Sequence, residues 1–258
     1  MLVTLTSLCW RVGVMGASAL LIVGCSTASG QPPLSSLSMD PSQPVLPTSP
    51  AADGAAVTSE STPPEPPLLI PFADAAGVQL MPLAPKVDGY AYHESLFPTA
   101  LSLSPHGHAT KVDNPRFSRP KRSVGPDYVV MASRGRDSGP TTGVDIVLDE
   151  GTTVVAPVSG EVVDASAYKL YCETPDRRLI IRPSDHPDDR VVLFHLTDVQ
   201  VNRGDAVEAG VTPLGRPRVF SPHSAQYDDY IAGGHPHVHL EVEGEPTEPL
   251  PGCPIGRS

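Results

Sequence analysis

The sequence predicts an all-β domain, built as a compact antiparallel β-sandwich or open barrel, behind a disordered tether. Three observations lead to this prediction. The apolar runs between Tyr128 and Glu243 are short, rich in β-branched residues and separated by Gly, Pro and Asp, a pattern typical of strands and turns. No sustained 3.6-residue periodicity is present, so little room remains for helices. The segment before residue 68 has the composition of an unfolded linker.

The expected strands are short runs of Val, Ile and Leu bounded by turn residues. Each has the length of an ordinary strand, about four to eight residues. In chain order they cover residues 128–133, 143–148, 152–157, 160–165, 178–182, 190–196 and 237–243. We therefore expect the β-domain to occupy residues 128–258, and residues 68–127 to form an irregular leader without an assigned role.

The N-terminal residues 1–24 are expected to be a signal peptide. Arg11 precedes an uncharged stretch, residues 12–24, that is short for a membrane span and suits a signal-peptide core. The stretch ends in Leu21-Ile22-Val23-Gly24-Cys25, which resembles a bacterial lipobox and so implies lipidation of Cys25. An uncleaved membrane helix is the alternative. The expected location is outside the cytoplasm, with lipid on Cys25 anchoring the protein to a bacterial membrane and the domain in the envelope.

Residues 25–67 are expected to be a Pro/Ser-rich disordered linker. Between Ser26 and Pro67 the chain has ten prolines and no lysine or arginine. Such a segment cannot bury enough apolar surface to offset the entropy lost on ordering. We expect it to tether the domain to the lipid anchor.

Charge and cysteine content narrow the partners and the compartment. The formal net charge of −11 argues against nucleic acid as a partner. Apart from Cys9 and Cys25, the chain has only Cys172 and Cys253. In an exported protein this pair is a candidate disulfide, although the sequence does not show that the two residues meet.

The run from residue 237 to residue 243, HVHLEVE, is the most informative strand. Because side chains alternate along a strand, His237 and His239 point from one face while Val238, Leu240 and Val242 point from the other. The histidines are expected to face a groove and the valines and leucine a core. Two imidazoles on one edge suggest a metal site or a general base, provided that further ligands come from elsewhere.

Seven short motifs between residues 143 and 241 resemble those of a known family and follow one another in the same order as in that family. They are GVDI at 143–146, GTTVVAP at 151–157, GEVV at 160–163, FHL at 194–196, VNRGDAVEAG at 201–210, LG at 214–215 and HVHLE at 237–241. Over about residues 141–243 this pattern resembles the LytM or lysostaphin-type zinc endopeptidase domain, which has the duplicated-hybrid-motif β-fold. The resemblance implies peptidoglycan as the partner, and one zinc ion held by His, Asp and His.

Within this resemblance one metal position is degenerate. Asp145 and His239 match two zinc ligands, while His195 and His237 match the histidines that act as general base and stabilise the tetrahedral intermediate. Thr141 stands where the first zinc histidine is expected. Threonine is not a usual zinc ligand, and two protein ligands are one fewer than a catalytic zinc normally has. Zinc is therefore expected to bind weakly or not at all.

Another histidine could replace the missing ligand. The candidates are His106, His108, His223 and His235, because none of them is excluded by the sequence. His93 and His186 are expected at the surface.

Three functions remain open. The first is a lipoprotein whose degenerate LytM-like domain binds peptidoglycan or regulates a wall hydrolase, as degenerate members of the family do. The second is an active zinc-dependent peptidoglycan endopeptidase that uses a substitute ligand. The third is a carrier domain of the biotinyl or phosphotransfer kind, which the lipobox and the absence of a lysine in a tight hairpin argue against.

Overall fold

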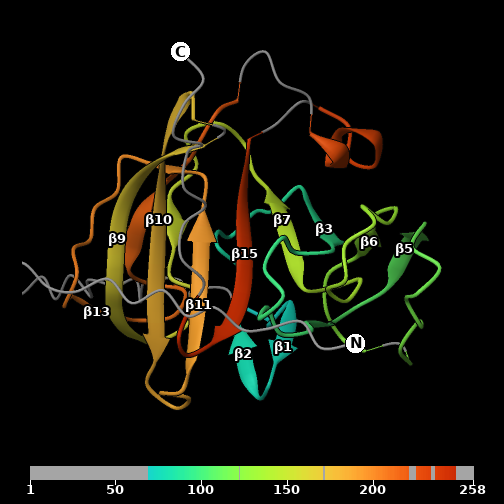
Figure 1. The fold of residues 1–258 in the computed structure, drawn as a ribbon, viewed down its shortest axis with the longest axis horizontal. Helices are drawn as coiled ribbons and strands as arrows, with labels where there is room; N and C mark the ends of the chain where they lie inside the picture. Colours follow the sequence, from blue (N-terminus) through green and yellow to red (C-terminus); the bar gives the residue numbers. More distant parts are fainter. Residues whose placement is uncertain (1–68, 122, 171, 221–224, 234–235, 248–258) are drawn as a thin grey trace, which may run out of the picture. The chain divides into compact units, whose positions relative to one another are not determined.

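A computed structural model describes residues 69–121, 123–170, 172–220, 225–233 and 236–247. The expected signal peptide, Cys25, the linker and Cys253 lie outside these residues, so they stay predictions. The regular secondary structure of the described chain is almost entirely β-strand, which confirms the predicted fold class (Figure 1). Its one helical element is the short 3-10 helix η1 (Gln226–Asp229). Within the described residues, no helix has the length and hydropathy needed to span a bilayer.

Nine strands form the largest sheet, in the order β13-β9-β10-β11-β15-β7-β3-β6-β5. Their bounds are β13 (Ala206–Val207), β9 (Gly160–Leu170), β10 (Thr174–Pro183), β11 (Asp189–Phe194), β15 (His237–Gly244), β7 (Gly143–Val147), β3 (Gly89–His93), β6 (Tyr128–Val130) and β5 (Ala109–Val112). Neighbours are antiparallel from β13 to β3. The pairs β3–β6 and β6–β5 are parallel, a departure from the wholly antiparallel expectation.

Two three-stranded sheets accompany the large one. The first has the order β2-β1-β4, with β2 (Val78–Leu80), β1 (Ala73–Ala75) and β4 (Ser104–Pro105). The second has the order β12-β14-β8, with β12 (Leu196–Thr197), β14 (Pro213–Pro217) and β8 (Val154–Val155). Apolar side chains of both pack in one buried cluster with those of the large sheet, so the arrangement is a β-sandwich.

The two faces of the large sheet differ in character. One face turns alternate residues of β15, Val238, Leu240 and Val242, into the main core, where they are fully buried. The other face carries His237 and His239, with two smaller apolar clusters on the strands to either side. The expected division of β15 into a core face and a histidine face is therefore confirmed.

Residues 69–127 differ from the expected irregular leader. They contain β1 to β5, and β3 pairs between β7 and β6 inside the large sheet. Tyr90 and Tyr92 of β3 are buried in the main core. The physical reason is that β7 would otherwise present an unpaired buried edge, which β3 satisfies with backbone hydrogen bonds.

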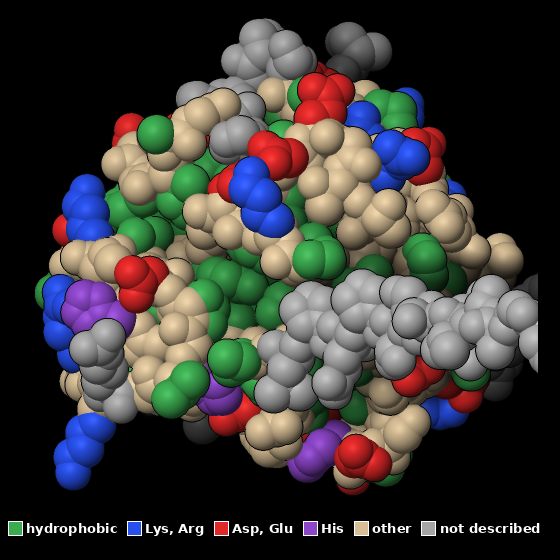
Figure 2. Space-filling view, turned by 180° about the vertical axis from the view of Figure 1, so that it is seen from behind, with side chains coloured by type: hydrophobic (Ala, Val, Ile, Leu, Met, Phe, Trp, Pro, Cys, Tyr) green, Lys and Arg blue, Asp and Glu red, His purple; other side chains and the backbone are tan. Residues whose placement is uncertain are grey.

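Figure 2 shows one surface of the described chain. Hydrophobic side chains gather near its centre, while lysine, arginine, aspartate and glutamate side chains lie mostly toward the rim. The overall charge therefore does not appear there as a single acidic patch.

Candidate metal centre

Three neighbouring strands bring three possible metal ligands to one face. His239 of β15 is the register partner of Asp145 of β7. On the other side of β7, Ala91 of β3 is opposite Asp145 and His93 is opposite Gly143. Because side chains two residues apart share a face, His93 points from the same face as Asp145 and His239.

The three ligand atoms form a small triangle. The distance between His93 Nε2 and Asp145 Oδ1 is 3.0 Å, and that between His239 Nδ1 and Asp145 Oδ1 is 2.8 Å. The two nitrogens are 3.2 Å apart. Ligand atoms about 2.0–2.1 Å from a tetrahedral zinc ion would be about 3.3 Å apart, so the triangle needs little expansion to hold one. The three residues are the group of the described chain that could hold a metal ion.

The hydrogen-bond partners of the His93 and His239 imidazoles favour a cation between these two rings and Asp145. His93 Nδ1 lies 2.9 Å from the carbonyl oxygen of Glu94, so Nδ1 donates a proton to it. His239 Nε2 lies 2.6 Å from a carboxylate oxygen of Glu241 and donates to it in the same way. With these protons placed, the lone pairs of the other two nitrogens converge with Asp145 Oδ1. A carbonyl or carboxylate behind each ligating histidine is the usual support of a metal site.

The pKa values of Asp145, His93 and His239 depend on one another. Burial opposes charge on Asp145, but the neighbouring histidines outweigh it and hold the pKa of that carboxyl well below its usual value. Burial lowers the pKa of His93, with Asp145 acting in the opposite direction. For His239 burial again favours the neutral form, but the bonds to Asp145 and Glu241 prevail and raise its pKa to about 9. A metal ion would therefore displace a proton from His239.

Gly143 provides the room in which the two rings meet. A Cβ atom at this position would lie 2.9 Å from His239 Cε1 and 3.0 Å from His93 Cε1. The ring centroids of the two histidines are 4.9 Å apart. The glycine is therefore needed for the approach of the ligands.

A buried carboxylate next to His93 organises the adjoining loop. Glu94 accepts hydrogen bonds from five donors. These donors are Asn114 Nδ2, Arg116 Nη2, Ser133 Oγ and the backbone N–H groups of Arg134 and Arg136. Burial would raise the pKa of Glu94, but these bonds prevail and lower it to about 2. The loop places the Arg134 guanidinium 3.7 Å from Asp145 Oδ2, the oxygen outside the ligand triangle.

Two further histidines border the ligand triangle. His195 follows β11, and its ring centroid is 4.9 Å from that of His237. His195 Nδ1 lies 2.7 Å from Asp176 Oδ2 of β10. His237 Nε2 lies 3.9 Å from Asp145 Oδ1, and burial lowers the pKa of His237 to about 3. The four expected site residues Asp145, His195, His237 and His239 are thus brought together.

The expectation that His93 lies at the surface is wrong. Its side chain is 1% exposed, because β3 is an internal strand rather than part of a loop. Thr141 is also buried, and its hydroxyl donates a hydrogen bond to the Leu103 carbonyl oxygen at 2.8 Å. Thr141 therefore supports the backbone, while His93 lies beside Asp145 and His239 as the third residue of the group that could hold a metal ion.

The other histidines considered as substitutes lie elsewhere or outside the described residues. His106 bonds to the Pro71 carbonyl oxygen and to Asp74, and His108 lies 4.0 Å from Asp127. His186 is partly exposed. His223 and His235 are not among the described residues, and neither is Cys253. Cys172 is exposed, and its pairing with Cys253 stays a prediction because Cys253 lies outside the described residues.

The sequence alone did not identify three residues of the site, His93, Glu94 and Asp176. The run GYAYH at 89–93 has the aromatic, β-prone composition of a strand, and a histidine at its end was the available signal. Glu94 and Asp176 had no such signal, because their partners come from distant segments.

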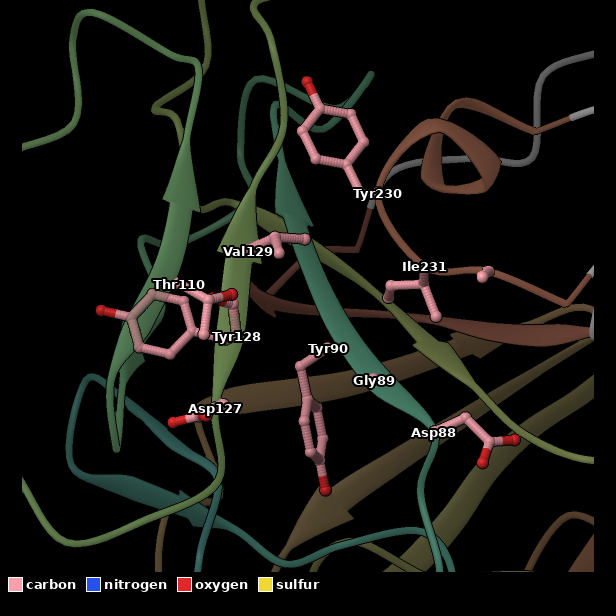
Figure 3. Close-up of a pocket in the computed structure, with 10 residues that line it drawn as sticks. Asp88, Gly89, Tyr90, Thr110, Asp127, Tyr128, Val129, Tyr230 and Ile231 are labelled. Atoms are coloured by element: carbon pink, nitrogen blue, oxygen red, sulfur yellow. The ribbon is translucent and has the colours of Figure 1, made fainter.

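A separate hollow of about 400 Å³ lies beside Gly89, at the end of β3 opposite to His93 (Figure 3). Its lining includes Gly89, Asp127, Tyr128, Tyr230 and Ile231 and contains no residue of the ligand triangle. The candidate metal centre is therefore distinct from this hollow.

Comparison with known proteins finds similarity only among solved structures. No protein-family model and no curated protein matches the chain. A solution structure of lysostaphin is 24% identical with a TM-score of 0.32, over 41% of this chain and 37% of that one. The lysostaphin catalytic domain from Staphylococcus simulans is 24% identical with a TM-score of 0.33, over 44% and 74% of the two chains. A zinc-containing peptidase from Vibrio cholerae is 18% identical with a TM-score of 0.33, over 58% and 37%. The matched region thus spans little more than a third of two of these three chains.

Proposed function

We propose that this chain is a zinc-dependent endopeptidase of peptidoglycan that uses His93 as its third protein ligand. The observation that carries the proposal is the convergence of His93 Nε2, Asp145 Oδ1 and His239 Nδ1 within 2.8–3.2 Å of one another. Three protein ligands with a fourth position left for substrate or water are the usual set of a catalytic zinc. The motif resemblance over residues 141–243 supplies the substrate class.

The residues around the triangle suit peptide hydrolysis. A bound zinc ion would polarise the scissile carbonyl and make water more acidic. His195 and His237 border the same point and supply the groups that move a proton and hold developing negative charge. The arrangement therefore favours the active enzyme over the alternative domain that only binds the wall or regulates a hydrolase.

Zinc content tests the proposal. The purified protein is expected to bind one zinc ion per chain, and His93→Ala to weaken binding at least about 100-fold because two ligands remain. Thr141→Ala is the matched control, since Thr141 is buried four residues before Asp145 but bonds to the Leu103 carbonyl oxygen. It should keep its zinc. Binding is measured by titration against a competing chelator.

Digestion of purified peptidoglycan, followed by separation of the released peptides, tests the activity. The unmodified protein should release new amino termini from the peptide chains, and His93→Ala should not. A protein that binds no zinc, or a His93→Ala variant that retains it, would contradict the proposed site. Zinc binding without cleavage would favour the wall-binding function instead.

Residues 1–67 supply a second part of the proposal. The lipobox-like sequence before Cys25 and the proline-rich residues that follow suit a lipid-anchored protein of the bacterial envelope, where peptidoglycan is within reach. Lipidation, export and the disulfide between Cys172 and Cys253 are parts of this proposal.

A further inference from the structure

Asp176 is buried behind one of the two site histidines. Its side chain is 0% exposed, and its Oδ2 lies 2.7 Å from His195 Nδ1. The same oxygen accepts a hydrogen bond from the Tyr168 hydroxyl at 2.5 Å, while Oδ1 accepts one from the Arg177 backbone N–H at 2.8 Å. Both oxygens are therefore occupied, and the carboxylate has a fixed orientation.

The large sheet aligns these three side chains. Tyr168 of β9 is the register partner of Asp176 of β10. Two residues further along β10, Arg178 is opposite Phe194 of β11, so Asp176 lies beside the point where β11 ends and His195 follows. His195 itself has a φ of 67°, an uncommon conformation for a residue other than glycine. The sheet thus holds the imidazole against Asp176 despite an unfavourable backbone.

The contacts of the imidazole determine where its proton lies. An ionised carboxylate only accepts hydrogen bonds, so His195 Nδ1 carries the hydrogen and Nε2 keeps a lone pair. The ring of His195 is packed beside those of His237 and Phe220, at centroid distances of 4.9 and 4.8 Å. The two histidines differ at Nδ1, because His195 Nδ1 bonds to Asp176 whereas His237 Nδ1 has no hydrogen-bond partner among the described residues.

We propose that Asp176, supported by Tyr168, is a positioning residue that makes His195 Nε2 the proton acceptor of the reaction. The inference rests on the proposed function. As water attacks the carbonyl carbon and a C–O bond forms, one water proton passes to His195 Nε2. When the C–N bond breaks, that proton passes to the leaving amine nitrogen, so His195 returns to its starting form. His237, whose Nδ1 has no hydrogen-bond partner among the described residues, is left to donate a hydrogen bond to the carbonyl oxygen.

Nitrogen-15 NMR of the histidine side chains tests the positioning without relying on activity. In the zinc-loaded protein, His195 is expected as the Nδ1–H tautomer, and Asp176→Asn is expected to shift it partly or wholly to Nε2–H. Asp164→Asn is the matched control, because Asp164 is a carboxylate of the same sheet that bonds to Arg178. It should leave the His195 signals unchanged.

Kinetics on wall peptides supply a second readout. Asp176→Asn is expected to lower kcat about 100- to 10,000-fold with KM and zinc content within about twofold, since substrate and metal do not contact Asp176. Tyr168→Phe is expected to lower kcat about tenfold, because Asp176 keeps its other partners. A purely structural role would change zinc content or KM as well.

The outcomes separate this inference from the function on which it rests. If the zinc-loaded protein cleaves no wall peptide, the proposed function fails, while the tautomer of His195 still tests Asp176. An Nε2–H tautomer in the unmodified protein would overturn the inference, as would an unchanged kcat in Asp176→Asn. If Asp176→Asn does not fold, two other results test the inference. The Nδ1–H tautomer of His195 in the unmodified protein and a lowered kcat in Tyr168→Phe would support it, and the Nε2–H tautomer or an unchanged kcat would overturn it.

Discussion

At the scale of single residues, the metal centre depends on what surrounds each ligand. His93 and His239 approach closely because Gly143 leaves space between them. Each ring is oriented by an acceptor on its far side, the Glu94 carbonyl oxygen or the Glu241 carboxylate. Ligand geometry therefore rests on residues that would not themselves contact the metal.

Gly143→Ala is predicted to weaken zinc binding about tenfold or more while leaving the fold nearly as stable. The new Cβ would lie within 3.0 Å of both imidazole rings, so the rings must move apart, whereas the backbone need not change. Gly244→Ala is the control, because a Cβ there meets no atom within 4 Å. Chelator competition and thermal unfolding measure the two effects. Equal zinc affinity in both variants would contradict this account of Gly143.

Glu94→Gln is predicted to lower the free energy of unfolding at pH 7 by about 2–3 kcal/mol, because a buried charge-assisted network loses its acceptor. The burial of Glu94 is outweighed by its hydrogen bonds, which hold its pKa at about 2 in the folded protein, below the ordinary value of 4.5. A depressed carboxyl pKa stabilises the fold above the unfolded value and loses that contribution as pH falls from about 4.5 to about 2.

Denaturant unfolding at several pH values tests this prediction. The unmodified protein should lose stability over that pH range, and Glu94→Gln should show a flatter dependence. Glu208→Gln serves as the control because Glu208 is exposed. A slope in Glu94→Gln equal to that of the unmodified protein would mean that other groups cause the acid sensitivity.

At the scale of elements, β3 joins the metal centre to the core of the sheet. Its Tyr90 and Tyr92 side chains pack in the main core, and His93 at its end faces the candidate site. The parallel pairing of β3 with β6 and the antiparallel pairing with β7 make it an internal strand. An element that was expected to be an irregular leader therefore supplies both core side chains and a candidate metal ligand.

The fragment 128–258 is predicted neither to fold as a monomer nor to bind zinc, because it lacks β3 and leaves the edge of β7 unpaired. The fragment 69–258 retains β3 and should do both. Circular dichroism, size-exclusion chromatography and zinc content compare the two. A soluble, folded 128–258 fragment with bound zinc would show that β3 is dispensable.

At the scale of the whole molecule, anchoring and chemistry are expected to reside in separate segments. Cys25 and the proline-rich linker lie within residues 1–67, whereas the three candidate metal ligands lie between residues 93 and 239. Among the described residues, the main core of the sandwich is formed by side chains between residues 72 and 242.

Cys25→Ala is predicted to abolish labelling by a fatty-acid analogue and to move the protein from the membrane fraction to the soluble fraction. Its zinc content should be unchanged, because the candidate ligands His93, Asp145 and His239 lie outside the segment that carries Cys25. Metabolic labelling, cell fractionation and metal analysis measure the three properties. Persistent labelling would refute lipidation at this residue.

The sequence by itself determined the β-class of the domain, the two faces of β15 and the positions of Asp145, His195, His237 and His239 in one site. These features depend on local periodicity and on motifs within one run of chain, which a sequence displays directly. It did not reveal β3 as an internal strand. Nor did it reveal His93 as a ligand, although the end of a tyrosine-rich run was a usable signal.

Tertiary structure alone decided the third candidate ligand and the partners behind the histidines. His93 meets Asp145 across 52 residues of chain, and Asp176 meets His195 through the pairing of β10 with β11. Strand order and register set such contacts, and a shift of one residue would turn each side chain to the opposite face. Thr141 therefore marked a missing ligand along the chain, while the fold places a candidate for that ligand, His93, on another strand.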